Sequence, residues 1–260
     1  MSRNKLAAAL RPSADGLSLS GMNKSLKISC VFLFLFVLFG VLVNNASAHQ
    51  PRLVYDLKST PKEPFIIYDG TDVSRAFYGL LKGQPDYYKF VLDKPADIYL
   101  GLLVPDIKNT QTNVSANIYS VKADKTILKY KLDAASSKWE TFYENYGGDN
   151  YFKGPEMTKN LPADTYIVEV VNPNNLGEYV LAVGTEESFP LKEMFKAFVN
   201  ASSLKRDFFN KSFFAIFEGK IGGYLMGMLI ALILIIVLAV FGFKRIRIKK
   251  VINNQLKTEV

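Results

Sequence analysis

The residues with the most evident chemical potential lie between Ser136 and Asn160, where aromatic rings alternate with carboxylates. The candidate ligand-binding residues in this stretch are Trp139, Tyr143, Tyr146, Asp149 and Tyr151. Aromatic rings offer an apolar face to a sugar, and acidic groups accept hydrogen bonds from its hydroxyls. The stretch, which Gly147-Gly148 interrupts, is therefore a candidate carbohydrate- or small-ligand-binding loop. The alternative is a satellite core in which the same aromatics cap one end of the fold.

Three aspartates, Asp69, Asp72 and Asp86, lie in expected turns near strand ends. Oxygen ligands of this kind suit Ca²⁺, so a structural calcium site is one interpretation. The other is that they are ordinary turn residues, because the chain has no 12-residue calcium-binding loop. We expect no other cofactor.

The chain lacks the residues that other kinds of active site require. The chain contains one histidine, His49, and one cysteine, Cys30. His49 would be the first residue of the mature chain, and once Cys30 is removed with the signal peptide no other histidine or thiol is left for a catalytic triad or a zinc site. A hydrolase lacks a credible nucleophile and base, and we predict that the protein is not an enzyme.

The formal net charge of +8 suggests a nucleic-acid-binding protein at first sight. Residues 49–189, however, carry 15 Lys and Arg against 19 Asp and Glu, a net charge of −4. The positive charge lies at the two ends and beside apolar runs, where basic residues set membrane orientation. We therefore expect no binding to nucleic acid.

The N-terminal region has the three parts of a secretory signal peptide. A basic stretch from Met22 to Lys27 precedes a 13-residue apolar run, Val31 to Val43, and Ala46-Ser47-Ala48 follows as a cleavage site. We predict a signal peptide over residues 1–48, with cleavage after Ala48. The sequence leaves open whether translation starts at Met1 or Met22.

A 23-residue uncharged run from Ile221 to Phe243 predicts one transmembrane helix, since such a helix is about 35 Å long. The basic tail, residues 244–260, should be cytoplasmic and the bulk of the chain extracytoplasmic. The prediction is thus a single-pass, type I protein of the cell membrane. Gly223 and Gly227 form a GxxxG pattern that could pair two such helices into a homodimer.

Residues 190–220 contain six basic and three acidic residues among many phenylalanines. The candidate membrane-interface residues are Phe195, Phe198, Phe209, Phe213 and Phe217. Their spacing by three and four predicts an amphipathic juxtamembrane helix that lies in the lipid interface. The alternative is a helix that packs on the preceding domain or on a partner.

Short, alternating runs rich in Tyr, Val, Ile and Phe fill the region between these segments. Nine candidate strands are 53–57, 65–68, 76–81, 87–92, 97–104, 114–121, 126–132, 165–171 and 179–183. Turn residues such as Asp69-Gly70 and Asn172-Pro173 separate them. Many short strands without helical periodicity predict an all-β sandwich, jelly-roll-like, over residues 49–189.

Several of these runs share a pattern with a known family. They are Gly79-Leu80-Leu81, Asp86-Tyr87-Tyr88-Lys89-Phe90, Leu161-Pro162-Ala163-Asp164-Thr165-Tyr166 and Gly177-Glu178-Tyr179-Val180-Leu181. Over residues 75–184 the chain resembles bacterial and archaeal pre-peptidase C-terminal domains, with Asp164 where the family usually has Gly. The resemblance implies a small non-catalytic β-sandwich used in adhesion, targeting or folding.

These observations lead to one main expectation about function and one alternative. The main expectation is a non-enzymatic, membrane-anchored extracytoplasmic module for surface binding, adhesion or assembly with a partner. The alternative is a carbohydrate- or small-ligand-binding domain that uses the aromatic stretch 136–160. The expected partners are the lipid bilayer and an unknown protein or glycan.

Overall fold

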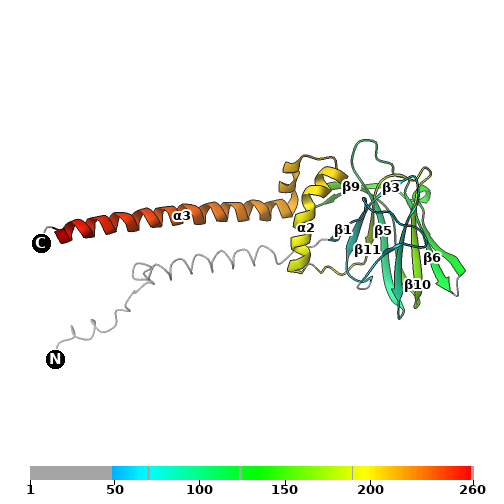
Figure 1. The fold of residues 1–260 in the computed structure, drawn as a ribbon. Helices are drawn as coiled ribbons and strands as arrows, with labels where there is room; N and C mark the ends of the chain where they lie inside the picture. Colours follow the sequence, from blue (N-terminus) through cyan, green and yellow to red (C-terminus); the bar gives the residue numbers. More distant parts are fainter. Residues whose placement is uncertain (1–48, 69–70, 123–124, 189, 259–260) are drawn as a thin grey trace, which may run out of the picture. The chain divides into compact units, whose positions relative to one another are not determined.

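A computed structural model describes residues 49–68, 71–122, 125–188 and 190–258. The predicted signal peptide, and Asp69 of the candidate calcium site, lie outside the described residues. The described strands form two sheets that face each other as a sandwich (Figure 1). The expected all-β sandwich is therefore confirmed.

The six-stranded sheet has the order β1-β3-β11-β5-β9-β8. Its strands are β1 (Gln50–Leu53), β3 (Arg75–Lys82), β11 (Leu176–Val183), β5 (Ala96–Pro105), β9 (Asp149–Leu161) and β8 (Glu140–Glu144). The five-stranded sheet has the order β2-β4-β10-β6-β7. Its strands are β2 (Phe65–Ile66), β4 (Asp86–Leu92), β10 (Asp164–Val171), β6 (Ser115–Lys122) and β7 (Lys125–Leu132). The pairs β1–β3 and β2–β4 are parallel, and the other described pairs are antiparallel.

The main core lies between the sheets and follows from the alternation of side chains along each strand. On β4, Tyr88 and Phe90 point inward, and the ring of Phe90 stacks on Tyr166 of β10 at 5.1 Å between centroids. Alternation puts every second residue on the same face, so an apolar residue at each second position builds one buried layer. Both sheets contribute such layers to the core.

A chain of hydrogen bonds crosses this core. The hydroxyls of Tyr88 and Tyr179 are 2.7 Å apart, and Tyr179 donates to Asp86 over 2.7 Å. Because the Tyr179 proton goes to Asp86, Tyr88 must donate to Tyr179. Gly79, opposite Tyr179 in the sheet, leaves room for its ring, since a Cβ there would lie 2.2 Å from the ring. Every polar group in this buried chain thus has a partner.

A loop prediction and a strand boundary were wrong. The stretch 136–160, expected to be a loop, follows a short 3₁₀ turn, η3 (Ala134–Ser136), and forms the β8–β9 hairpin. Gly147 and Gly148 lie in the turn of this hairpin, where Gly148 has φ 78°. The first strand was expected at 53–57, but β1 ends at Leu53 and a turn follows at Tyr55.

The segment after the sandwich consists of α2 (Leu191–Ser203), a π-helical turn η4 (Leu204–Phe208), a 3₁₀ turn η5 (Phe213–Phe217) and α3 (Gly219–Thr258). An amphipathic juxtamembrane helix was expected in residues 190–220, and the structure has several helical elements there in place of one continuous helix. The chain breaks at Asn210, whose φ of 53° no α-helix accommodates. Ser212 then caps η5 by accepting a hydrogen bond from the backbone N–H of Phe214.

Among the described residues, one helix is long and apolar enough to cross a membrane. It is the first part of α3, Gly219–Gly242, with a mean hydropathy of 3.0. Its large apolar side chains, such as Leu229 and Ile233, are half exposed along the helix. The helix continues through the basic tail to Thr258.

Candidate functional site

The outer face of the six-stranded sheet carries a second apolar cluster, which the segment 190–218 covers. We call this segment the anchor segment. Phe208 and Phe209, both buried, lie on Tyr78 and Tyr151, with ring centroids 5.1 Å and 5.4 Å apart. Aromatic pairs in such edge-to-face contacts stabilise by about 0.5–1.5 kcal/mol beyond their buried area. The anchor segment is therefore part of the folded domain.

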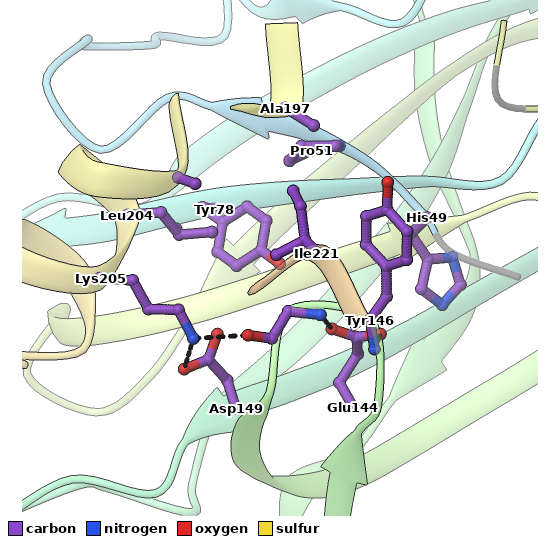
Figure 2. Close-up of a pocket in the computed structure, with 12 residues that line it drawn as sticks. His49, Pro51, Tyr78, Glu144, Tyr146, Asp149, Ala197, Leu204, Lys205 and Ile221 are labelled. Carbon is purple, nitrogen blue, oxygen red and sulfur yellow. Dashed lines mark hydrogen bonds and ion pairs between the residues drawn. The ribbon is translucent and has the colours of Figure 1, made fainter. Parts of the chain in front are cut away.

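A buried ionic cluster, called here the clamp, joins the anchor segment to the β8–β9 turn. The clamp consists of Asp149, Lys205, Lys211 and Glu218. Lys205 and Asp149 are almost fully buried, and their Nζ and Oδ1 atoms are 2.8 Å apart. Figure 2 shows Lys205 beside Asp149. Lys205 also donates to the carbonyl of Gly147 over 2.6 Å. Both charges are thus satisfied by partners far away in the sequence.

Lys211 connects the two acidic groups of the clamp. Its Nζ lies 2.9 Å from Asp149 Oδ1 and 2.7 Å from Glu218 Oε2. Burial alone would lower the pKa of Lys211, but its hydrogen bonds to Glu218 and Asp149 outweigh burial and raise it. The hydrogen bond from Lys211 in turn lowers the pKa of Glu218. Lys211 and Glu218 are therefore charged at neutral pH, and the ion pairs of Lys211 join Glu218 to Asp149.

The first turn of α3 is hydrogen-bonded directly to the sandwich. The backbone N–H groups of Lys220 and Ile221 donate to the carbonyls of Asn145 and Tyr146, each over 3.0 Å. These N–H groups have no partner within a helix's first turn, so the hairpin turn caps α3. The helix of membrane-spanning length therefore begins in direct contact with the sandwich.

Two glycines make this close approach possible. Gly148 and Gly219 both have positive φ, 78° and 64°. A Cβ on either residue would lie 2.5 Å from the backbone nitrogen of the other, a distance that real structures do not show. The turn and the helix start can meet at this distance only because neither residue has a side chain.

A cavity of about 60 Å³ lies beside the clamp, between β1, the β8–β9 turn and α2. Its lining includes His49, Glu144 and Tyr146, which Figure 2 shows around it. Glu144 accepts hydrogen bonds from the backbone N–H groups of Tyr146 and Gly147. Burial raises the pKa of Glu144, and these hydrogen bonds oppose the increase. Burial lowers the pKa of His49. Ligand pockets are roughly 300–1,000 Å³, so this cavity has room for water molecules but not for a sugar.

The five candidate ligand-binding residues do not share a surface. Tyr146, Asp149 and Tyr151 are buried in the contacts with the anchor segment and the outer sheet face. The ring of Trp139 packs on Gly154 of β9 and against the main core, while Tyr143 is half exposed. The alternative, in which these aromatics serve as a core, describes most of them better, because they pack in the two apolar clusters.

Two of the three candidate calcium ligands, Asp72 and Asp86, lie among the described residues. Asp86 is buried, and its carboxylate accepts from Ser59 and Tyr179. Burial raises its pKa, and these hydrogen bonds oppose the increase. Asp72 is exposed. Within the described residues, no three His, Cys, Asp or Glu side chains form a group that could hold a metal ion.

The candidate membrane-interface residues divide into two sets. Phe209 is buried under the clamp, and Phe198 is half buried beside Tyr146 and Ile221. The expectation that Phe209 faces lipid is therefore corrected. Phe195 on α2 and Phe213 and Phe217 on η5 are exposed. Gly223 and Gly227 on α3 have open space around them, and their role in pairing helices stays a prediction.

The opposite outer face, on the five-stranded sheet, carries an open groove of about 350 Å³. Its residues are Pro61, Lys62, Pro64, Tyr87, Lys89, Tyr119, Val121, Thr126, Thr165, Ile167 and Glu169. We call it the tyrosine groove. Tyr87 and Tyr119 reach Glu169 from the two neighbouring strands, each donating over 2.9 Å. Burial, followed by the hydrogen bond to Glu169, raises the pKa of Tyr87 to about 12.

Comparisons with known proteins give a limited result. No family model matches the chain, and no curated protein matches it. Among solved structures, the chain is similar to the pre-peptidase C-terminal domain of a collagenase from Bacillus anthracis. The identity is 14%, the TM-score is 0.30, and the match covers 49% of this chain and 98% of that one.

A second match is the catalytic domain of a GH87 alpha-1,3-glucanase in complex with nigerose. Its identity is 15% and its TM-score 0.24, over 43% of this chain and 22% of that one. The first match names the family that the residue pattern resembles. At these TM-scores neither likeness carries an argument about function.

Apart from Asp149, which was a candidate ligand-binding residue, the residues of the clamp and of the tyrosine groove were missed in the sequence. Lys205 and Asp149 are 56 positions apart, and no local pattern joins them. A signal did exist on β4, β6 and β10, where Tyr87, Tyr119 and Glu169 occupy the polar positions of alternating strands. Pairing the strands would have placed these three side chains together.

Proposed function

We propose that this protein is a non-enzymatic module anchored in a cell membrane, extracytoplasmic and jelly-roll-like, which presents its sandwich for binding or assembly with a partner. The observation that carries the proposal is the direct attachment of α3 to the β8–β9 turn. If the domain were freely hinged to an apolar helix of spanning length, the helix would only tether the domain to the membrane. Here the clamp and two backbone hydrogen bonds fix the domain at the start of the helix.

The exposed aromatics near the start of α3 support a position at the bilayer surface. Phe195 and Val199 are one turn apart on α2, with Lys192 and Lys196 also exposed. Apolar side chains flanked by lysines are typical of segments that lie in the headgroup region. Each such lysine adds about 1 kcal/mol of attraction to an anionic surface. The anchor segment thus uses one face for the sandwich and offers the other to lipid.

The acidic groups that could have served catalysis are used inside the structure. Asp149 pairs with two lysines, Glu144 accepts from two backbone N–H groups, and Asp86 accepts from Tyr179. A general acid or base must be able to exchange a proton with a substrate in reach. These roles favour a binding module over a hydrolase.

Topology labelling tests the proposal in cells that carry the full chain. In a Cys30→Ser background, Thr112→Cys in the sandwich and Gln255→Cys in the tail provide one label site each. A membrane-impermeant maleimide should label intact cells at position 112 only, and position 255 only after lysis. The reverse pattern, or release of the chain by alkaline carbonate, would refute the proposal. N-terminal sequencing should begin at His49, whereas an intact N-terminus would contradict signal cleavage.

A further inference from the structure

The two outer faces of the sandwich differ in what covers them. The six-stranded sheet is covered by the protein's own anchor segment, which buries Phe208 and Phe209 on it. The tyrosine groove lies on the other sheet. Its volume of about 350 Å³ falls within the range of small-ligand sites, roughly 300–1,000 Å³. It is therefore the surface from which a ligand can be bound while the domain stays anchored.

The floor of the groove is held in one arrangement before any ligand arrives. Glu169 on β10 accepts from Tyr87, Asn117 and Tyr119, all over 2.9 Å, so both of its oxygens are engaged. Two phenol rings are thereby fixed on either side of the central strand. A rigid aromatic platform binds at a lower cost in side-chain entropy than a mobile one.

The charged side chains of the groove that remain available to a ligand are positive. Among the described residues that line it, Glu169 is the acidic one, and its hydrogen-bonding capacity is largely used within the sheet. Lys62 and Lys89 line the same groove, and neither forms an ion pair with any residue that the structure describes. Lys89 is half buried. In a domain of net charge −4, this is a local site for an anion.

We propose that the tyrosine groove binds an acidic saccharide, with a sugar ring on Tyr87 and Tyr119 and its carboxylate at Lys62 and Lys89. A pyranose has an apolar C–H face that packs on aromatic rings, and hydroxyls that bond to threonines such as Thr126 and Thr165. A lysine ammonium forms a short, charge-assisted hydrogen bond to a carboxylate. The combination of rings, hydroxyls and unpaired lysines matches a hexuronic acid unit, whether free or in a surface polysaccharide.

This inference names a ligand class for the surface-binding role proposed above. It rests on that role only because the role requires the groove to be exposed to the ligand. Calorimetric titration of the full chain in detergent micelles measures it without a bilayer. The probes are a galacturonic acid trisaccharide and the same trisaccharide as its methyl ester, which has no charge. The acid should bind about tenfold more tightly than the ester. Failure of the labelling experiment with binding intact would refute only the membrane proposal.

Matched variants locate the binding. Tyr87→Ala and Lys89→Gln should each weaken binding of the acid about tenfold, and Lys89→Gln should leave the ester unaffected. Tyr143→Ala and Lys159→Gln, exposed on the six-stranded sheet, should change neither. Glu169→Gln keeps the size of the side chain and should weaken both probes by loosening the two tyrosines. A polymer of the same sugar that binds while the trisaccharide does not would still support the site if Tyr87→Ala abolishes it.

Four results would overturn the inference. The first is equal affinity for acid and ester, since the lysines would then have no role. The second is no binding of the acid, as trisaccharide or polymer, by a folded chain. The third is binding that Tyr143→Ala weakens as much as Tyr87→Ala, which would place the site elsewhere. An acidic peptide that binds in place of the saccharide, with the same variants, would likewise refute the choice of ligand.

Discussion

Removing the acidic group of the clamp is the sharpest test of how the anchor segment is attached. In Asp149→Asn, Lys205 keeps the carbonyl of Gly147 and a carboxylate oxygen of Glu218 3.7 Å away, but loses the carboxylate at 2.8 Å. An ammonium that is 2% exposed then lies in the interior without a close counter-charge. Breaking a buried ion pair in this way costs about 3–5 kcal/mol.

Removing the lysine of this pair should cost less stability than removing the aspartate, because Asp149 has a second lysine close to it whereas Lys205 has no second carboxylate equally close. In Lys205→Met, Asp149 still has Lys211 at 2.9 Å, and the methionine side chain fills most of the space. The lost hydrogen bonds are then worth about 1–3 kcal/mol. A salt bridge at the surface, Lys138 with Glu140, provides the control, since the Lys138 side chain is 85% exposed. Lys138→Gln should change stability by less than about 1 kcal/mol.

Amide hydrogen exchange of Lys220 and Ile221 provides the assay, because these N–H groups donate across the contact. Since about 1.4 kcal/mol corresponds to a factor of ten, Asp149→Asn should speed their exchange by roughly two to three and a half orders of magnitude, unless global unfolding limits it. The control variant Lys138→Gln should leave their exchange unchanged. Unchanged protection of Lys220 and Ile221, or an equal effect of both clamp variants, would refute the reasoning.

Three further predictions address the core, the close approach and pH. Phe90→Ala removes a buried ring stacked on Tyr166 and should cost about 3–5 kcal/mol in chemical unfolding, with less than 1 kcal/mol arguing against the register. Gly219→Ala places a Cβ 2.5 Å from the Gly148 nitrogen and should speed exchange at Lys220 and Ile221, whereas Gly227→Ala, with open space around it, should not. The pKa of Glu218 is lowered by Lys211, so its contribution to stability is present above the unfolded pKa and is lost as pH falls through the folded pKa. Thermal stability of Glu218→Gln should therefore approach that of the unmodified chain under acid conditions and fall below it at neutral pH, and a constant difference would contradict this.

Much of the sandwich could be predicted because its central strands alternate strictly. The strands β4, β6 and β10 bury every second residue, most of them apolar, and each lies within about two residues of its predicted bounds. The hairpin β8–β9 was missed because its aromatic residues serve two apolar clusters on opposite faces. Phe152 packs against the main core, while Tyr151 packs under Phe209. Such a strand shows no single polar face.

The candidate site was harder to predict, since it depends on contacts between distant segments. The phenylalanines of residues 190–220 show a helical spacing, and the sequence cannot distinguish a helix on lipid from one on protein. In the structure, Phe209 is buried against the sandwich, whereas Phe213 is exposed. Lys205 was not singled out, because its closest counter-charge, Asp149, is 56 positions away in the sequence and reaches it only through the fold.

The position of the anchor segment in the chain has a consequence for the order in which the protein is made. All eleven described strands precede it in sequence, so the ribosome completes the sandwich before Phe208 and Phe209 are available. Until then Tyr78 and Tyr151 lack the aromatic cover that they have in the finished protein. A nascent or truncated chain ending near residue 186 would therefore expose an uncovered aromatic patch. Completion of the last part of the chain both closes this patch and starts the helix that follows it.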